Sequence, residues 1–410
     1  MRNTLKIFSF FSGSGFLDLG FELSNFDIAY ASDIFSPFIE AYRYSRQSLN
    51  LPLPEYGYHQ GEEADITQLT QGESALYLRN LMQDARKNTD IIGFIGGPPC
   101  PDFSVGGKNR GSEGENGKLS ASYIELICQQ QPDFFVFENV KGLWRTKKHR
   151  NFFENLKYKL QQSGYILVER LINAIEYGVP QDRDRIILVG FRKTVIQDLG
   201  IKLSKHDNVL PEGIFPWKKH VLYPKPEIFS LHWPSTAPFE EDSHFPCPDH
   251  IPQELTVEYW FRKNDVLNHP NAQHYFKPRT GLKRFTSVEE GDDSKKSYKR
   301  LHRWRYSPTA CYGNNEVHLH PYKVRRISAA EALAIQSLPK EFIFPETMSL
   351  TNLFKTIGNG VPFLASMAIA QTISGFLSNP KCPDKLAINT NQVGDADFTQ
   401  FISPKFSSIY

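Results

Sequence analysis

The chain opens with an apolar run that ends in a glycine-rich turn and passes into a helical pattern. Leu5 to Phe11 reads as a buried strand, Ser12-Gly13-Ser14-Gly15 as a tight turn, and Phe16 to Leu23 has helical spacing. A strand, a turn and a helix in this order are typical of the first unit of an α/β domain. The opening therefore favours a sheet with helices packed on its faces.

The same strand pattern recurs further along the chain, with helical stretches such as Tyr123 to Gln130 between the repeats. The recurring segments are Ile28 to Ala31, Ile91 to Ile95, Phe134 to Phe137 and Ile186 to Phe191. We therefore predict a doubly wound, mostly parallel sheet. Reactive groups in such sheets gather at the carboxyl ends of the strands, so the residues that follow each strand are the candidates for function.

Composition bounds the class of protein. The 410 residues suffice for two domains, or for one domain with a large insertion. Lysine plus arginine (47) nearly equals aspartate plus glutamate (45), so net charge indicates no polyanionic partner. The five scattered cysteines form no CxxC pair, which argues against a zinc site or a disulfide framework. Without a leader or an apolar run of membrane-spanning length, we expect a soluble protein of a reducing compartment.

The regular pattern stops after Arg192 and returns at Arg325. The intervening segment is rich in proline and aromatic residues and has no strand-helix rhythm, which indicates a separate, irregular domain. Between Phe276 and Tyr306, lysine and arginine alternate with aromatic residues, as on a surface that binds a polyanion. A solvated charged face is an equally good interpretation. The chain after Asn379 lacks periodicity and reads as a loose tail.

The glycine turn and the acids after it favour a nucleoside ligand. Backbone amides of Ser12–Gly15 can receive a polar or anionic group, although a simple strand-helix connection explains the turn as well. Asp33, at the end of the next strand, is placed to accept bonds from ribose hydroxyls. Asp65 and Ile66 supply a third contact near an adenine edge, unless Asp65 merely caps a turn. Asp18 would oppose a pyrophosphate, so a sulfonium nucleoside fits better than a dinucleotide.

A thiol and a carboxylic acid follow two further strands. Cys100 lies in a glycine- and proline-bounded turn, Gly96 to Ser104, where a nucleophile is favoured over the usual small buried thiol. Glu138 ends another strand, and capping the next turn is its alternative role. Converging in one cleft, the two suit addition to an electron-poor ring such as cytosine, with the thiolate attacking carbon and the acid engaging a ring nitrogen.

Two arginines precede the last strand of this region. Arg183 and Arg185 alternate along the chain, so both side chains would point to one face, and guanidinium groups suit phosphate and base carbonyls. Alternating charges on an edge strand are the competing interpretation.

Six segments, taken in order, resemble the motifs of the DNA (cytosine-5)-methyltransferase family. They are Phe11–Gly15, Gly97–Cys100, Phe137–Val140, Gln181–Arg185, Arg326–Pro339 and Ile357–Pro362. The resemblance covers about residues 5–192 and 325–376, and it leaves unmatched the region where family members carry a variable target-recognition domain. It implies a catalytic and cofactor-binding domain over 1–192, a target-recognition domain over 193–324, a segment completing the catalytic domain over 325–378, and a tail over 379–410.

The resemblance also implies the chemistry. S-adenosylmethionine would be the methyl donor and S-adenosylhomocysteine its product, with no metal, and the substrate would be a cytosine flipped out of double-stranded DNA. Cys100 would add to carbon 6, Glu138 would engage ring nitrogen 3, and Ser104 to Lys118 would form a mobile loop. The catalytic set is Cys100, Glu138, Arg183 and Arg185. The cofactor set is Phe11, Gly13, Ser14, Gly15, Asp33, Ile34, Asp65, Ile66, Pro98, Asn359 and Val361.

Three positions depart from the family pattern: Phe16 replaces a usual glycine, Asp33 a usual glutamate and Pro101 a usual glutamine. The resemblance places the protein in a prokaryotic cytoplasm, as the modification enzyme of a restriction-modification system with a cognate restriction endonuclease as genetic partner. An RNA methyltransferase, a silent nucleic-acid-binding protein and, more remotely, a nicotinamide dehydrogenase are the alternatives.

Overall fold

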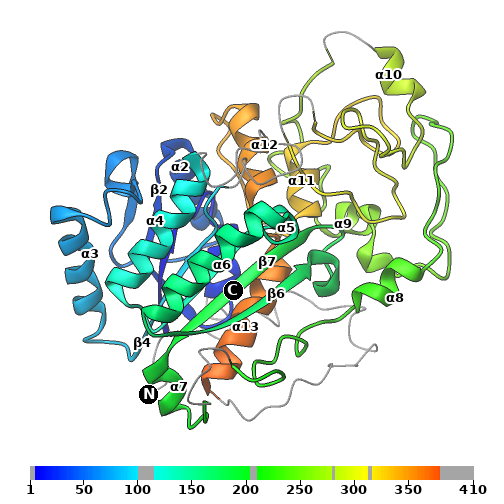
Figure 1. Cartoon of the computed structure of the whole chain (residues 1–410). Helices are drawn as coiled ribbons and strands as arrows, with labels where there is room; N and C mark the ends of the chain where they lie inside the picture. The colour runs from blue at the N-terminus through cyan, green and yellow to red at the C-terminus, as the bar shows by residue number, and fades with distance from the viewer. Residues whose placement is uncertain (1–4, 100–114, 204–209, 279–281, 313–315, 379–410) are drawn as a thin grey trace.

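The computed structural model describes residues 5–99, 115–203, 210–278, 282–312 and 316–378, and its centre is one seven-stranded sheet (Figure 1). The strand order is β3-β2-β1-β4-β5-β7-β6. The strands are β1 (Leu5–Phe10), β2 (Phe26–Asp33), β3 (Tyr58–Gln60), β4 (Ile91–Gly96), β5 (Phe134–Val140), β6 (Tyr165–Asn173) and β7 (Asp184–Arg192).

The first five strands are parallel, and β7 runs antiparallel to both β5 and β6. The predicted mostly parallel sheet is thus confirmed, with one antiparallel strand, β7, that the sequence pattern did not reveal. Because β7 lies between β5 and β6, it is not an edge strand. The strand order reverses between β1 and β4, and ligands of such sheets bind beyond the carboxyl ends of the strands at this point.

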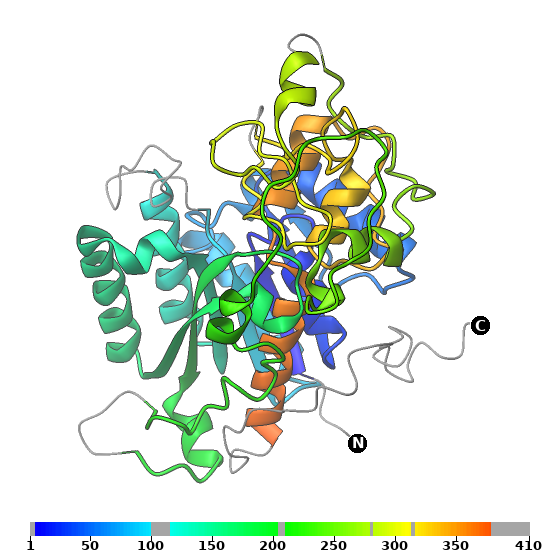
Figure 2. The same ribbon diagram turned by 90° about the vertical axis from the view of Figure 1, so that its right-hand side faces the viewer.

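Helices cover both faces of the sheet (Figure 2). Side chains of α1, α2 and α13 pack on one face, and those of α3, α4 and α6 pack on the other. The helices are α1 (Phe16–Glu22), α2 (Ser36–Ser48), α3 (Gly72–Ala85), α4 (Glu115–Gln130), α5 (Lys141–Arg145), α6 (Lys147–Gln162), α7 (Lys193–Asp198), α8 (Lys225–Ser230), α9 (Val257–Lys263), α10 (Leu282–Ser287), α11 (Ala329–Ile335), α12 (Leu350–Asn359) and α13 (Phe363–Ser378). Short 3-10 turns are η1 (Gly61–Ala64), η3 (Ala174–Tyr177) and η4 (Gln253–Leu255).

The last helix packs against the first one. A Cβ atom at Gly20 in α1 would lie 2.3 Å from Ser366 Oγ in α13, so only glycine permits this approach. Ser366 Oγ donates a hydrogen bond of 2.6 Å to the Leu17 carbonyl. The C-terminal segment therefore shares one core with the beginning of the chain. A capping box of Ser328 and Glu331, whose Ser-x-x-Glu spacing is visible in the sequence, starts α11.

The irregular middle segment packs in two places. Ile196 and Phe215 join the core of the sheet beside Phe191 and Phe376. The later part lies at one end of the molecule, next to α11 and α12 (Figure 1), and Trp260 belongs to the hydrophobic core that those helices form. The boundary at residue 193 stays a prediction.

Two cations of the basic, aromatic stretch lie inside the protein. Arg303 is paired with Glu290 at 2.8 Å, and each side chain is 3% exposed. Arg300 donates to the carbonyls of Val288 and His320 at 2.8 and 2.5 Å. Lys296, in contrast, is 71% exposed. Part of this stretch therefore stabilises the fold. This role differs from both interpretations taken from the sequence, a polyanion-binding surface and a solvated charged face.

One helical stretch has the length and composition of a membrane span. It is Leu350–Ser378, which comprises α12 and α13, and 67% of its most apolar window is buried inside the protein. Burial against α1 and the sheet explains its apolar composition.

Candidate functional site

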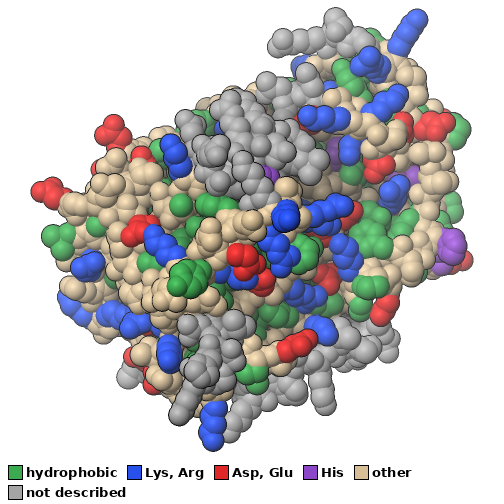
Figure 3. Space-filling view, viewed as in Figure 1, with side chains coloured by type: hydrophobic (Ala, Val, Ile, Leu, Met, Phe, Trp, Pro, Cys, Tyr) green, Lys and Arg blue, Asp and Glu red, His purple; other side chains and the backbone are tan. Residues whose placement is uncertain are grey.

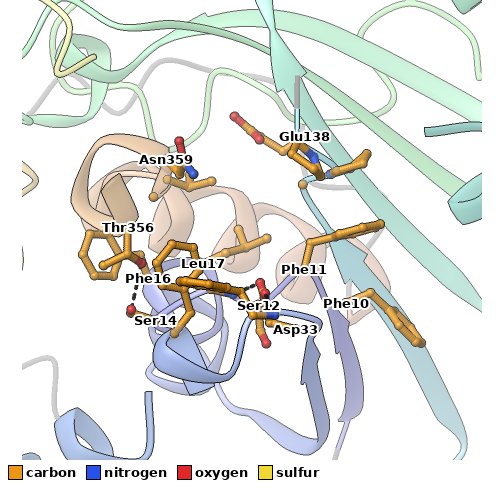
Figure 4. A pocket seen from close by; sticks show the side chains of 18 of the residues that line it. Phe10, Phe11, Ser12, Ser14, Phe16, Leu17, Asp33, Glu138, Thr356 and Asn359 are labelled. Carbon is orange, nitrogen blue, oxygen red and sulfur yellow. Dashed lines mark hydrogen bonds between the residues drawn. The ribbon is translucent and has the colours of Figure 1, made fainter. Parts of the chain in front are cut away.

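One cavity of about 630 Å³ lies at the carboxyl ends of the central strands, within the size range of small-molecule sites (Figure 4). Twelve of the residues predicted from the sequence line it: Phe11, Gly13, Ser14, Asp33, Ile34, Asp65, Ile66, Pro98, Glu138, Arg185, Asn359 and Val361. Glu138 and Asn359 lie toward one end, and Ser12 and Asp33 toward the other (Figure 4). Ten of the eleven residues expected to bind cofactor thus share one space with Glu138 and Arg185, and Gly15 is the one that does not line it.

Ser12, Gly13 and Ser14 of the glycine turn, Ser12–Gly15, form one wall of the cavity. Gly13 and Gly15 have φ values of +55° and +83°, the left-handed region that glycine adopts without strain. Ser12 Oγ donates to the Ser32 carbonyl at 2.9 Å, and the Ser14 hydroxyl bonds the Thr356 hydroxyl at 2.8 Å. The turn is therefore tied to β2 on one side and to α12 on the other.

Asp33 lies at the end of β2, and both its oxygens accept bonds from the backbone. The Gly13 amide donates to Oδ2 at 3.0 Å and the Phe35 amide to Oδ1 at 2.9 Å. Burial raises the pKa of Asp33, against the effect of these two amides and of Lys355. A carboxylate offers about four lone-pair positions, so two remain for ligand hydroxyls. The shorter acid thus still reaches the turn and keeps capacity for a ribose.

Asp65 and Ile66 approach the cavity from the loop after η1. Asp65 Oδ1 accepts from the Thr67 amide at 2.9 Å and from its hydroxyl at 2.8 Å, so Asp65 caps its own turn while lining the cavity. Ile34, at the same cavity, is 58% exposed. Ile34 and Ile66 provide apolar surface for a flat ring, and Asp65 fulfils the capping role given as its alternative.

Glu138 and Arg185 form an ion pair between neighbouring strands. Arg185 Nε lies 2.8 Å from Glu138 Oε1, and the side chains are 13% and 9% exposed. Burial raises the pKa of Glu138, and Arg185 and then Arg183 oppose that shift. A carboxyl with a raised pKa near a guanidinium can hold a proton for a bound ring or hydrogen-bond to it.

The loop toward Cys100 passes directly over Glu138. A Cβ atom at Gly97 would lie 2.7 Å from Glu138 Oε2, so a side chain at this position would displace the carboxylate end of Glu138. Asn139 Nδ2 reaches the Pro98 carbonyl at 3.5 Å. Cys100, Pro101 and residues 104–114 of the predicted mobile loop lie outside the described residues, and residues 115–118 belong to α4.

Arg183 lies behind the cavity wall rather than in it. Its side chain is 1% exposed, and its guanidinium donates to the carbonyls of Ala310 at 3.1 Å, Gly358 at 2.8 Å and Gly360 at 3.0 Å. Arg183 and Arg185 therefore do not point together into the cleft. Arg183 connects β7 with the middle segment and with the loop after α12.

Several lining residues were not found from the sequence. Lys355 and Thr356 immediately precede the Ile357–Pro362 motif, and Cys311 and Tyr312 come from the irregular segment. The Lys355 Nζ atom lies 5.3 Å from the centre of the ring of Phe35, which also lines the cavity, and the two form a cation–π contact. In the sequence, only their position next to the Ile357–Pro362 motif could have indicated that Lys355 and Thr356 belong to the site.

Phe16 forms part of the cavity wall with Gly360. A Cβ atom at Gly360 would lie 2.2 Å from Phe16 Cδ2. The Phe16 ring also packs edge-on against Phe342, with centroids 5.2 Å apart. This departure from the family pattern is thus accommodated by a glycine on the opposite side.

Lysine and arginine side chains gather beside this site, over α5 and the start of β7 (Figure 3). Lys141 and Lys225 share Asp184 at 2.5 and 2.6 Å, which leaves this group of three with one excess positive charge. Among the residues that the structure describes, no group of three or more His, Cys, Asp or Glu side chains is arranged to hold a metal ion.

The chain matches the model of one protein family, described as C-5 cytosine-specific DNA methylase, over residues 5–375. It is 58% identical over 378 residues to the Type II methyltransferase M.NmeDI of Neisseria meningitidis serogroup C, covering 92% of this chain and 85% of that protein. It is 28% identical to the Type II methyltransferase M.FnuDI of Fusobacterium nucleatum, covering 92% and 96% of the two chains.

Solved structures share the fold. A putative DNA modification methyltransferase encoded within an Escherichia coli prophage aligns with a TM-score of 0.59 at 21% identity, covering 92% of this chain and all of that one. The Spodoptera frugiperda DNMT2 mutant structure aligns with a TM-score of 0.52 at 17% identity, again over 92% of this chain and all of that one.

Proposed function

Because the chain belongs to the C-5 cytosine-specific DNA methylase family and is a DNA cytosine-5 methyltransferase, we propose that it methylates a flipped-out cytosine through a covalent bond from Cys100. One observation carries this proposal: a single cavity joins the glycine turn with the Glu138–Arg185 pair, and the loop leading to Cys100 crosses that acid. The target base must leave the duplex, since carbon 6 is unreachable within the stack.

The residues divide the chemistry as follows. The Cys100 thiolate forms a bond to carbon 6, while Glu138 hydrogen-bonds or protonates ring nitrogen 3 and so draws electrons from the ring. Carbon 5 then has enamine character. Arg185 holds Glu138 in place and offers its remaining N–H groups to the base. After carbon 5 gains the methyl group, loss of its proton drives elimination of the thiolate and restores the aromatic ring.

The other end of the cavity would hold S-adenosylmethionine, which when bound would supply an electrophilic methyl group and leave as S-adenosylhomocysteine. The backbone of the Gly13–Gly15 turn would hold its polar end, and Asp33 would accept from ribose hydroxyls with the two lone-pair positions left free of backbone bonds. Ile34 and Ile66 would cover the faces of the adenine. Phe11, Pro98, Asn359 and Val361 would complete the enclosure.

The relatives' names support a role in DNA modification. Both proteins described above are called Type II methyltransferases, so we infer that this chain protects its own DNA against a cognate restriction endonuclease in a prokaryotic cytoplasm. The endonuclease would be a genetic partner, and physical contact is not required.

Transfer of a labelled methyl group tests the proposal. Purified protein is incubated with S-adenosylmethionine carrying a tritiated methyl group and with duplex DNA or structured RNA in parallel. We expect label in DNA alone, recovered as 5-methylcytosine after digestion to nucleosides. Label in RNA but not in DNA, or label at another base position, would contradict the proposed function.

A further inference from the structure

Asp18 is a buried carboxylate behind the glycine turn. It is the third residue of α1, its side chain is 0% exposed, and it is not among the residues that line the cavity. Two hydroxyl groups satisfy it: Ser9 Oγ donates at 2.7 Å and Tyr42 OH at 2.6 Å. From the sequence we expected Asp18 to lie near a bound ligand, where it would oppose a pyrophosphate. Its carboxylate instead lies outside the cavity lining and bonds to the protein around it.

Tyr42 connects this carboxylate to the glycine turn. A Cβ atom at Gly15 would lie 2.6 Å from Tyr42 Cε2, so the tyrosine ring presses directly against the turn. Tyr42 is 1% exposed and comes from α2, whereas Ser9 comes from β1. The ring supports Gly15, and its hydroxyl is anchored on Asp18. Three elements around the turn are therefore joined by one carboxylate.

The charges that surround the carboxylate balance one another. Arg46 lies over the Tyr42 ring, 5.6 Å from its centre, and is paired with Glu22 at 2.7 Å. Burial raises the pKa of Asp18 to about 6, with Tyr42, Ser9 and Arg46 opposing the shift. Because Glu22 neutralises most of the positive charge of Arg46, Arg46 stabilises the Asp18 carboxylate only weakly. The hydrogen bonds from Ser9 and Tyr42 are therefore the main interactions that stabilise buried Asp18.

We propose that Asp18, Tyr42 and Ser9 form a positioning cluster that holds the glycine turn in its binding conformation before cofactor arrives. The turn contains two glycines, and glycine can adopt many backbone conformations. Contacts that hold the turn in one conformation therefore lower the conformational entropy that is lost when cofactor binds. This inference rests on the proposed function for the identity of the cofactor. The cluster itself touches no cofactor, because it lies behind the turn.

Tyr42→Phe tests the cluster, since it removes one hydroxyl and keeps the ring against Gly15. We expect the dissociation constants of S-adenosylmethionine and S-adenosylhomocysteine to rise together by about tenfold, as the loss of one buried charge-assisted hydrogen bond predicts. The KM for S-adenosylmethionine rises equally, while kcat at saturating cofactor stays within about twofold of wild type. Asp18→Asn, a second variant of nearly the same shape, weakens both ligands in the same way.

Tyr165→Phe is the matched control. Tyr165 is fully buried and donates one hydrogen bond of 2.7 Å to the Pro132 carbonyl, at the opposite end of the sheet from the cavity. We expect it to lower the melting temperature as Tyr42→Phe does and to leave cofactor affinity unchanged.

Two results would overturn the inference. One is unchanged affinity in both Tyr42→Phe and Asp18→Asn with a stability loss like that of the control. The other is a loss confined to S-adenosylmethionine, which would mean that the Asp18 charge acts directly on the sulfonium. A wild-type chain that binds neither ligand would refute the proposed cofactor itself, and this shows before any variant is compared.

Discussion

At the scale of single residues, burial sets the state of the acids around the cavity. The pKa values of Asp18, Asp33 and Glu138 are all raised, and desolvation is the largest cause for each. Asp33 and Glu138 were found from the sequence because each stands where an apolar strand ends. Their hydrogen-bond partners could not be found in that way, because those partners come from other elements.

Asp33→Ala should weaken cofactor binding. It removes the acceptor of the Gly13 and Phe35 amides together with the proposed ribose acceptor, so we expect the KM for S-adenosylmethionine to rise about tenfold or more. Initial rates at varied S-adenosylmethionine measure this. Asp33→Glu, which keeps the charge, should recover part of the affinity, and an unchanged KM in the alanine variant would refute the ribose assignment.

Asp18 should make the protein less stable as pH rises. Its folded pKa of about 6 lies above the unfolded value of 3.8, so the folded state binds the proton more tightly. Stability from this group is therefore fully present below the unfolded pKa and is lost as pH rises through the folded pKa. Between about pH 5 and pH 7.5 the loss amounts to about 1 to 2 kcal/mol.

Comparison with Asp18→Asn isolates this contribution. Denaturant unfolding at both pH values gives the free energy of unfolding of each protein, and the Asn variant should gain on wild type by that amount as pH rises. A difference between the two proteins that does not change with pH would show that Asp18 does not titrate in this range.

At the scale of elements, contacts between distant segments define the cavity. The Ser14–Thr356 bond joins the glycine turn to α12, across 342 positions of sequence. Arg183 links β7 to the loop after α12. The strands, the turn and the capping box of α11 were predictable because each depends on a local pattern. These bonds depend on which segments meet in space.

Phe16 and Gly360 should behave as a coupled pair. Gly360 has φ −60°, which any residue adopts, and the three atoms nearest to an added Cβ all belong to the Phe16 ring, so this ring is what opposes a side chain there. Gly360→Ala should destabilise the protein by about 1 to 3 kcal/mol and raise the KM for cofactor. Phe16→Leu in the same chain should recover at least about 1 kcal/mol in a double-mutant cycle. Strictly additive effects would show that the two positions do not press on each other.

Arg183→Lys should impair binding rather than the chemical step. One ammonium cannot reach the three carbonyls that the guanidinium bridges, so both the middle segment and the loop after α12 lose a support. We expect weaker binding of cofactor and of DNA, each measured directly by titration. If kcat alone fell while both affinities stayed at wild-type values, Arg183 would instead contact the reacting base.

At the scale of the whole molecule, the C-terminal helix α13 packs against α1 near the start of the chain. The sheet order, the α1–α13 contact and the cavity place residues near 10, 138, 185 and 360 around one space. The parallel-sheet pattern predicted that the strand ends near residues 10 and 138 meet, and the resemblance alone predicted that residues near 360 join them. The antiparallel direction of β7 against β6 was not predictable, because the apolar pattern of a strand does not give its direction in the sheet. The burial of Arg300 and Arg303 was not predictable either, because composition does not distinguish a buried cation from an exposed one.

Covalent capture of the protein on modified DNA tests the central claim most directly. Duplex DNA in which 5-fluorocytosine replaces cytosine is incubated with S-adenosylmethionine and either wild-type protein or Cys100→Ala. Fluorine cannot leave carbon 5 as a proton does, so the thiolate cannot be eliminated. The account predicts a complex that survives denaturing gel electrophoresis for wild type and none for Cys100→Ala. An equally abundant complex with the alanine variant, or none with a wild-type protein that methylates ordinary DNA, would contradict it.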